Sequence, residues 1–170
     1  MRIIAGTHRS RILKTLEGDN TRPMMDVMKE SVFNCIGPYF DGGNVLDLFG
    51  GSGALSLESI SRGASHAYIS ELSRDAYKVI MDNVNVLKEN DKVTVFNMDY
   101  KIALTRLKGM KFDLIFLDPP YRLNIISEIV DLLESYDMIN NNAKIICHYV
   151  TGNQSLLTNY KVIKYNIILF

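Results

Sequence analysis

The sequence predicts an α/β fold in which a doubly wound parallel sheet carries helices on both faces, preceded by a β-hairpin and a helix. The 170 residues are 47% apolar and 22% charged, the size and composition of one domain with a packed core. From Asn44 onward, apolar runs of strand length alternate with amphipathic stretches of helix length. Several of these runs are apolar throughout, which is typical of strands buried on both faces. Together the alternation and the burial predict the α/β class.

Residues 1–43 predict a basic N-terminal appendage. Two short runs rich in Ile and Leu, Arg2–Ala5 and Arg11–Lys14, flank a Gly-containing segment and predict the hairpin. The apolar residues expected along its sides are Ile3, Ile4, Ile12 and Leu13. Thr21 is a suitable N-cap, and Pro23 fits the first turn of a helix that we expect to reach about Ile36. The apolar face expected for that helix consists of Val27, Val32, Phe33 and Ile36.

Residues 44–170 predict one further domain. The expected strands are Val45–Phe49, Ala67–Ser70, Val93–Phe96, Leu114–Leu117 and Lys144–His148. The expected helices between them are Ala54–Arg62, Arg74–Glu89, Tyr100–Leu107 and Ile125–Ser135. The last segment adds two strand-like pieces, Lys161–Tyr165 and Ile167–Phe170.

Charge is unevenly distributed although the net charge is zero. The first 15 residues carry four bases and no acid, which leaves 15 bases against 19 acids in the remainder. A basic arm on an acidic body favours contact between the arm and an anionic partner. The alternative is a solvated charged hairpin without a partner.

Composition also argues against several other classes of protein. No apolar run approaches the roughly 20 residues that cross a bilayer, and the N-terminus lacks the apolar core of a signal peptide, so we expect a cytoplasmic protein without a membrane partner. Cys35 and Cys147 lie far apart within apolar segments. We expect both to be small buried residues, with neither a disulfide nor a metal site.

Candidate binding residues follow the ends of four predicted strands. Three glycines in Asp47–Gly53 allow a sharp turn and the close approach of a ligand to the main chain. Glu71 follows Gly51 by 20 residues, at the end of the second strand, where a carboxylate can accept both hydroxyls of a ribose. Asp99 follows the third strand, although it could equally be the N-cap of the next helix. Because the carboxyl ends of parallel strands share one edge of the sheet, these groups should converge there.

The glycine loop fits an adenosyl ligand better than a phosphate-bearing one. A dinucleotide fingerprint needs a third glycine three residues after the second, but Gly53 is followed by Ala54, Leu55 and Ser56. No Gly-Lys-Ser or Gly-Lys-Thr of a phosphate-cradling loop occurs. These absences disfavour both the dinucleotide-dependent oxidoreductases and the nucleotide triphosphatases.

The most specific motif is Asp118-Pro119-Pro120-Tyr121, after the fourth predicted strand. Two prolines stiffen the loop and leave its carbonyls free to accept hydrogen bonds. A carboxylate and a fixed carbonyl suit the two hydrogens of an amino group, and Tyr121 offers a ring face for a flipped base. A simple Pro-Pro turn with an exposed Tyr is the structural alternative.

These motifs resemble the class I S-adenosylmethionine-dependent methyltransferases, which have a Rossmann-like fold. Within them the chain resembles the RsmD family, which methylates N2 of a guanine in 16S ribosomal RNA of the small subunit. The matching stretches are Met1–Gly6, Thr21–Pro23, Lys29–Asn34, Val45–Phe49, Gly51–Gly53, Ser61–Ala64 and Phe112–Tyr121. Met24 and His148 stand where the family often has a Thr and an acid.

The resemblance implies S-adenosyl-L-methionine as cofactor and a role for each matched residue. Asp47, Gly51 and Gly53 would shape the methionine pocket, Glu71 would hold the ribose and Asp99 the adenine amino group. The remaining implied cofactor positions are Phe49, Leu72, Asp118, Thr21, Arg22 and Pro23. The implied catalytic residues are Asp118, Pro119, Pro120 and Tyr121, acting without a metal. The candidates for RNA phosphates are Arg2, His8, Arg9, Arg11, Lys14 and Arg22.

The expected reaction is a direct in-line methyl transfer to a flipped base of small-subunit ribosomal RNA, within an assembled or assembling particle. An adenine-N6 methyltransferase acting on DNA or RNA uses the same acceptor chemistry and is the first alternative. A catalytically silent RNA-binding or ribosome-assembly factor is the alternative from another class.

Overall fold

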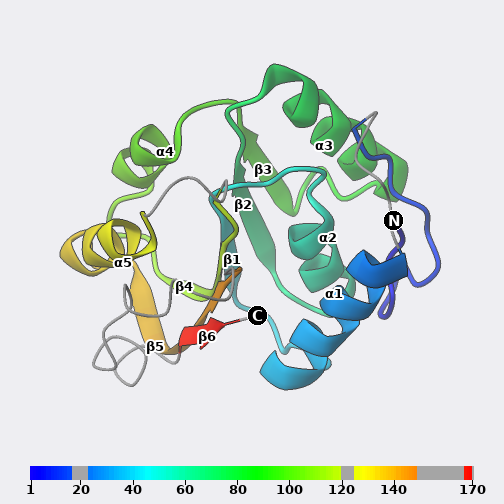
Figure 1. The fold of residues 1–170 in the computed structure, drawn as a ribbon, viewed down its shortest axis with the longest axis horizontal. Coiled ribbons are helices and arrows are strands. Elements are labelled where there is room, and N and C mark those ends of the chain that lie inside the picture. The colour runs from blue at the N-terminus through cyan, green and yellow to red at the C-terminus, as the bar shows by residue number, and fades with distance from the viewer. Residues whose placement is uncertain (17–22, 120–124, 149–166, 170) are drawn as a thin grey trace.

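A six-stranded parallel sheet runs through the centre of the described structure in the order β3-β2-β1-β4-β5-β6 (Figure 1). The computed structural model describes residues 1–16, 23–119, 125–148 and 167–169. Its strands are β1 (Asn44–Asp47), β2 (His66–Ser70), β3 (Val93–Phe96), β4 (Phe112–Leu117), β5 (Ile139–Cys147) and β6 (Ile167–Leu169). Its helices are α1 (Pro23–Ile36), α2 (Ala54–Ser61), α3 (Arg74–Leu87), α4 (Tyr100–Arg106) and α5 (Ile126–Ser135). The predicted α/β class is confirmed.

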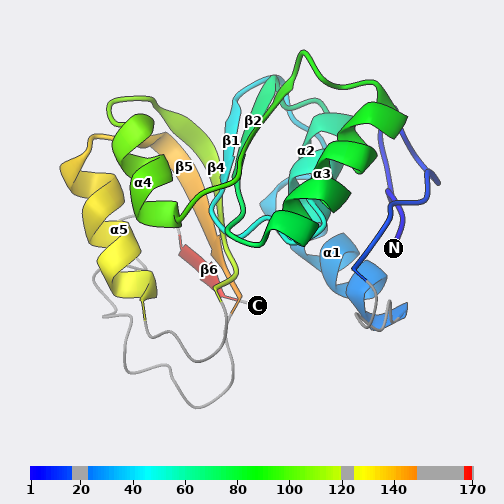
Figure 2. The same cartoon turned by 90° about the horizontal axis from the view of Figure 1, so that it is seen from above.

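Helices cover both faces of the sheet, as the uniformly apolar strands predict. Figure 2 shows α1, α2 and α3 on one face and α4 and α5 on the other. The first face packs Phe33, Ile60 and Ile80 in one buried cluster, and the second packs Leu104 and Leu133 in another. The neighbouring strands β1 and β4 are followed by α2 and α5, which lie on opposite faces of the sheet, so the loops after these strands diverge at a point that suits a ligand.

From Asn44 onward, the predicted strand and helix positions agree with the described structure to within two residues, apart from a larger difference at the start of the fifth strand. The first strand ends at Asp47, two residues before the predicted Phe49, because the glycine turn already begins there. The fifth begins at Ile139, before the predicted Lys144, and its pairing with β4 shifts register between Phe112 and Leu114. Polar Asn140, Asn141 and Asn142 fill the shifted stretch, which explains why no apolar pattern predicts it. The predicted strand at 161–165 lies outside the described residues.

The N-terminal arm, residues 1–16, contains one isolated antiparallel bridge between Arg2 and Ile12 in place of two regular strands. Main-chain hydrogen bonds join Ile3 to Arg11 and Leu13 to Met1. Ile3 and Leu13 are buried, but Ile12 is 78% exposed, so the expected apolar pairing holds for one side of the arm alone.

Two further burial predictions in this region are wrong. Val27 is 61% exposed, so the buried apolar residues of the described part of α1 are Val32, Phe33 and Ile36. Cys35 is exposed, whereas Cys147 is buried as predicted. Cys35 precedes the buried Ile36 in the last turn of α1 and therefore points away from the core, since neighbouring helical residues differ by about 100° in direction.

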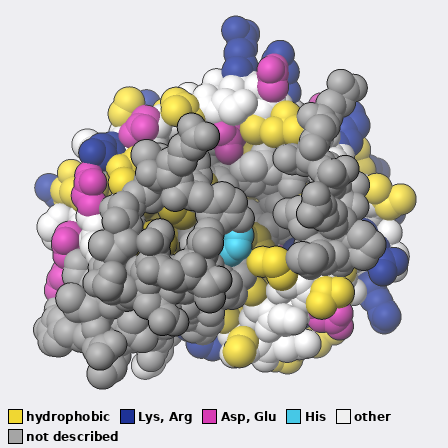
Figure 3. All heavy atoms as spheres, in the orientation of Figure 1, with side chains coloured by type: hydrophobic (Ala, Val, Ile, Leu, Met, Phe, Trp, Pro, Cys, Tyr) yellow, Lys and Arg dark blue, Asp and Glu magenta, His cyan; other side chains and the backbone are white. Residues whose placement is uncertain are grey.

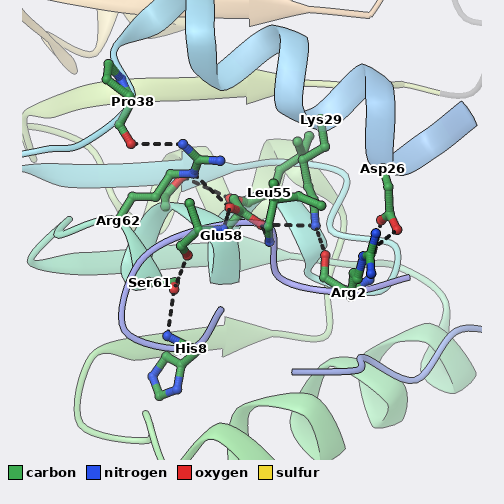
Figure 4. A network of polar contacts seen from close by, with 12 residues as sticks. Arg2, His8, Asp26, Lys29, Pro38, Leu55, Glu58, Ser61 and Arg62 are labelled. Carbon is green, nitrogen blue, oxygen red and sulfur yellow. Dashed lines mark hydrogen bonds and ion pairs between the residues drawn. The ribbon is translucent and has the colours of Figure 1, made fainter. Parts of the chain in front are cut away.

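A buried carboxylate attaches the arm to the body. Glu58 on α2 is fully buried and accepts hydrogen bonds from the main-chain N–H groups of Ile4 and Ala5 at 2.8 and 3.0 Å. Its charge is balanced by Arg62 Nε at 2.7 Å and by Lys29 Nζ at 3.1 Å (Figure 4). The arm, α1 and the end of α2 therefore meet at one side chain. Ile3 and Leu13 also share a core cluster with the sheet, while the proposed domain boundary at residues 43–44 stays a prediction.

Candidate functional site

A pocket of about 410 Å³ opens at the carboxyl edge of the sheet. The loops after β1, β2, β3 and β4 all contribute to it, as expected for a ligand site in an open parallel sheet. The described residues that line it are Leu48, Phe49, Gly51, Glu71, Leu72, Met98, Asp99, Tyr100, Asp118 and Pro119.

The loop after β1 forms one wall of the pocket over the buried Asp47. Gly51 has a φ of +56°, and a Cβ placed on it would meet no atom within 4 Å, so its main chain faces open space. Asn83 of α3 supports the loop by donating to the carbonyl of Ser52 at 2.9 Å. The loop is thus supported by α3 on one side, and the main chain at Gly51 faces open space, which suits a ligand that lies against main-chain atoms.

Asp47 lies beneath this loop and is 2% exposed. Its Oδ2 accepts from Ser56 Oγ at 2.9 Å, and its Oδ1 accepts from the Phe49 N–H at 3.3 Å. The pKa of Asp47 is raised to about 7, mainly by burial; the two hydrogen bonds oppose this shift, and the nearby charges of Asp118 and Glu71 add to it. Asp47 therefore shapes the loop from inside and does not line the pocket.

Glu71 joins the loops after β1 and β2. Its two carboxylate oxygens accept from the N–H of Gly51 at 2.8 Å and the N–H of Ser73 at 2.7 Å. Each oxygen keeps a lone pair for a further donor, because a carboxylate offers about four acceptor sites. The side chain is fixed by the fold in a position where it can still accept hydroxyl groups.

Asp99 and Tyr100 form the side of the pocket beyond β3. Asp99 caps α4, with its Oδ1 accepting from the Lys101 N–H at 2.8 Å, so the N-cap alternative describes one of its roles. It also lines the pocket. The ring of Tyr100 lies 5.5 Å from that of Phe49, centroid to centroid, and the two rings give this wall an aromatic surface.

Asp118 lies where β4 ends and remains 46% exposed. Its Oδ1 is 2.7 Å from Nδ1 of His148, the residue that follows β5. The hydrogen bond to Asp118 raises the pKa of His148, against the effect of partial burial. Pro119, next in the chain, is buried and completes this end of the pocket.

The charge of the pocket restricts its ligands. Its described lining contains the carboxylates of Glu71, Asp99 and Asp118 and neither Lys nor Arg. A pyrophosphate would meet repulsion there, whereas a ligand that carries positive charge and hydroxyl groups is complementary. Among the described residues, no group of three or more His, Cys, Asp or Glu side chains could hold a metal ion.

The structure brings together most of those predicted cofactor and catalytic residues whose side chains it describes. Seven of them share the pocket, namely Phe49, Gly51, Glu71, Leu72, Asp99, Asp118 and Pro119. Asp47 and Gly53 lie behind it, Asp47 beneath the loop and Gly53 as the left-handed N-cap of α2. Thr21, Arg22, Pro120 and Tyr121 lie outside the described residues, as does the side chain of Pro23.

Sequence reasoning missed other residues of the site. Leu48, Met98 and Tyr100 line the pocket directly beside predicted residues, so position after a strand would have been a sufficient signal. Ser56 and His148 contact Asp47 and Asp118. Ser56 lies in the first turn of α2, and no sequence pattern marks it as part of the site. His148 could have been found as the residue that follows β5.

The predicted RNA-binding residues of the arm separate into two groups. Arg2 lies 3.6 Å from Asp26, Lys14 lies 2.8 Å from Asp82, and His8 lies 2.6 Å from Glu89. Arg9 and Arg11 are exposed at the tip, and no described acid pairs with them. On the face shown in Figure 3, both basic and acidic side chains lie around the rim, so the described surface there is mixed in sign.

None of the described helices is long and apolar enough to cross a membrane. This finding concerns the described part of the chain alone.

Comparison with known proteins identifies related chains. A family model described as conserved hypothetical protein 95 matches residues 1–166. "Putative rRNA methyltransferase YlbH" of Bacillus subtilis is 38% identical over 88% of this chain and 82% of its own length. "Ribosomal RNA small subunit methyltransferase D" of Escherichia coli K12 is 34% identical over 85% of this chain and 72% of its own length. The solved structure of "Putative methyltransferase yhhF from Escherichia coli" superposes with a TM-score of 0.76 at 33% identity, covering 86% of this chain and 80% of that one. The chain therefore belongs to the family described as conserved hypothetical protein 95, the RsmD family.

Proposed function

We propose that this protein uses S-adenosyl-L-methionine to methylate the exocyclic N2 of a guanine in small-subunit ribosomal RNA. The observation that carries the proposal is the acidic pocket, which ends at Asp118 and Pro119 in a chain whose relatives are named ribosomal RNA methyltransferases. The substrate is an assembled or assembling small-subunit particle, and the site of action is the cytoplasm.

The pocket residues fit the cofactor. Glu71 would accept the two ribose hydroxyls, and Phe49, Leu72 and Tyr100 would offer apolar surface to a purine. Carboxylates in a described lining that contains neither Lys nor Arg suit a ligand with an ammonium and a sulfonium group. When bound, S-adenosyl-L-methionine supplies an activated methyl group.

Asp118 and the Pro119 carbonyl would receive the amino group of the target base. The lone pair of guanine N2 is delocalised into the ring, so the protein must favour positive charge on that nitrogen. Hydrogen bonds from the two amino hydrogens to a carboxylate and a carbonyl do so, and they strengthen as the charge develops. They also fix the direction from which the nitrogen approaches. Pro120 and Tyr121 are proposed to complete this end of the site.

The arm would hold the RNA. Arg9 and Arg11 at its tip are the candidates for phosphate contacts, since Arg2, His8 and Lys14 already pair with acids of the body. Those three contacts join the arm to α1, to α3 and to the segment that follows α3.

Identification of the methylated nucleoside tests the proposal. Purified protein, methyl-labelled S-adenosyl-L-methionine and small-subunit particles from cells lacking the gene would be incubated together, and the digested RNA analysed. We expect N2-methylguanosine. N6-methyladenosine would replace the proposed base by the adenine alternative. Absence of label together with absence of cofactor binding would favour the silent RNA-binding factor.

A further inference from the structure

His148 lies beside the proposed acceptor carboxylate because of the sheet itself. The register of β4 and β5 pairs Leu117 with Cys147, so Asp118 and His148 are the next residues on two adjacent strands. The His148 N–H donates to the Leu117 carbonyl at 2.9 Å and thereby prolongs the ladder by one step. The main chain at position 148 is therefore fixed relative to the start of the Asp118 loop.

The side-chain contact has a defined direction. Nδ1 of His148 lies 2.7 Å from Oδ1 of Asp118. An ionised carboxylate can only accept, so Nδ1 carries the hydrogen. The His148 side chain is 18% exposed, against 46% for Asp118. The imidazole is therefore mostly buried, whereas the Asp118 carboxylate lines the pocket. Oδ2 of Asp118 then remains for the amino group.

We propose that His148 is a positioning residue for methyl transfer, holding the Asp118 carboxylate through Nδ1–H so that its second oxygen meets the amino group of the base. This inference rests on the proposed function. Its active form is the neutral imidazole with the hydrogen on Nδ1. An imidazolium would make the same contact, but its charge would weaken Asp118 as an acceptor and oppose the positive charge that develops on the nitrogen.

Other charged groups lie at the same sheet edge. They are Asp47 at the end of β1 and Glu71 directly after β2. The charges of Glu71 and Asp118 both act on Asp47 and raise its pKa. Asp118 from the β4 loop is the charged group that raises the pKa of His148. Activity should consequently rise with pH as His148 loses its proton, above the ordinary pKa of about 6.5 for histidine.

Three variants test the inference by methyl-transfer kinetics across the range from about pH 5.5 to 9. We expect His148→Ala to lower kcat by roughly tenfold to a hundredfold, the loss of one well-placed hydrogen bond. Its KM for S-adenosyl-L-methionine should not change, because His148 does not line the pocket. His148→Asn places an amide N–H near the position of Nδ1 and should restore kcat to within about threefold of wild type. Its rate should not follow the titration seen in wild type. His66→Asn, at the opposite edge of the sheet, is the matched control with wild-type kcat.

An NMR titration separates this inference from the proposed function. The chain has three histidines, so the signal of His148 is identified by its loss in His148→Asn. Asp118→Asn should lower the pKa of His148 because it removes the carboxylate charge. An unchanged kcat in His148→Ala, or the same His148 titration in wild type and Asp118→Asn, would overturn the positioning role. If the wild-type protein methylates no ribosomal RNA, the proposed function fails. The NMR titration of His148 still tests whether its imidazole pairs with the Asp118 carboxylate.

Discussion

The carboxylate of Asp47 and the hydroxyl of Ser56 form a hydrogen bond of 2.9 Å that is closed to solvent on both sides. Burial raises the pKa of Asp47 to about 7, far above the 3.8 of an unperturbed aspartate. The Asp47 side chain therefore links the first turn of α2 to the end of β1. It loses its proton and becomes a buried negative charge as the pH rises through about 7.

Asp47→Asn should stabilise the protein, and more so at higher pH. Between the two pKa values the folded chain binds a proton that the unfolded chain has released, so the contribution of Asp47 to stability falls as pH rises from about 4 to about 7. The advantage of the variant over wild type should grow by roughly 3 kcal/mol between about pH 5 and about pH 8. Denaturant unfolding at both pH values measures it. A difference independent of pH would contradict this account of Asp47.

Removing the buried carboxylate of Glu58 should destabilise the protein strongly. Glu58→Ala leaves Lys29 and Arg62 buried without their counter-charge, and the expected loss is roughly 3–5 kcal/mol. Glu128→Ala is the matched control, because its ion pair with Lys101 is about half exposed and solvent screens it, so its removal should change the free energy of unfolding little. Equal losses in the two variants, measured by denaturant unfolding, would be inconsistent with the buried network.

Two glycines with similar backbone conformations should respond differently to alanine. Gly6 has a φ of +85° and Gly109 a φ of +84°, so both variants carry the strain of the left-handed region, about 1 kcal/mol. A Cβ on Gly6 would lie 1.7 Å from the Ser61 carbonyl oxygen, whereas one on Gly109 would meet nothing within 4 Å. Gly6→Ala should therefore lose clearly more free energy of unfolding than Gly109→Ala, with faster hydrogen exchange in the arm. Similar losses would show that the arm is not packed tightly on α2.

The tip of the arm should determine how RNA affinity depends on salt. Neutralising Arg9 and Arg11 to Gln should reduce the slope of log K against log salt by about 2, one for each phosphate that the arm no longer neutralises. Lys108 and Lys111, on the loop between α4 and β4, provide a control with the same change of charge. If both double variants alter the slope equally, the arm has no specific role in RNA binding.

The positions of most elements could be predicted because local pattern and burial agree in this chain. The alternation of strand-length and helix-length segments after Asn44 correctly predicts the class of fold, and the predicted bounds of the strand Val93–Phe96 match the structure. The glycine loop, Glu71, Asp99 and Asp118 could be assigned to one edge because the carboxyl ends of parallel strands coincide there.

The remaining features depend on contacts between distant segments, and single-sequence patterns carry no information about these. Glu58 has the pattern of a solvated helical residue, yet it is fully buried because Lys29 from α1 and the main chain of the arm meet it there. Val27 fits an apolar helical face but is exposed, because α1 packs by its last two turns. The contact of His148 with Asp118 depends on the strand register, which is a property of the assembled sheet.

Methyl transfer by Asp118→Ala, compared with wild type on small-subunit particles, tests the central claim most directly. We expect the variant to lose at least about a hundredfold in kcat, because the alanine cannot accept the amino hydrogens as positive charge develops. Its affinity for S-adenosyl-L-methionine, measured by calorimetry, should stay within a fewfold of wild type, since Glu71 and the loop after β1 are untouched. A variant that transfers methyl groups at close to the wild-type rate would contradict the role of Asp118 and the proposed mechanism with it.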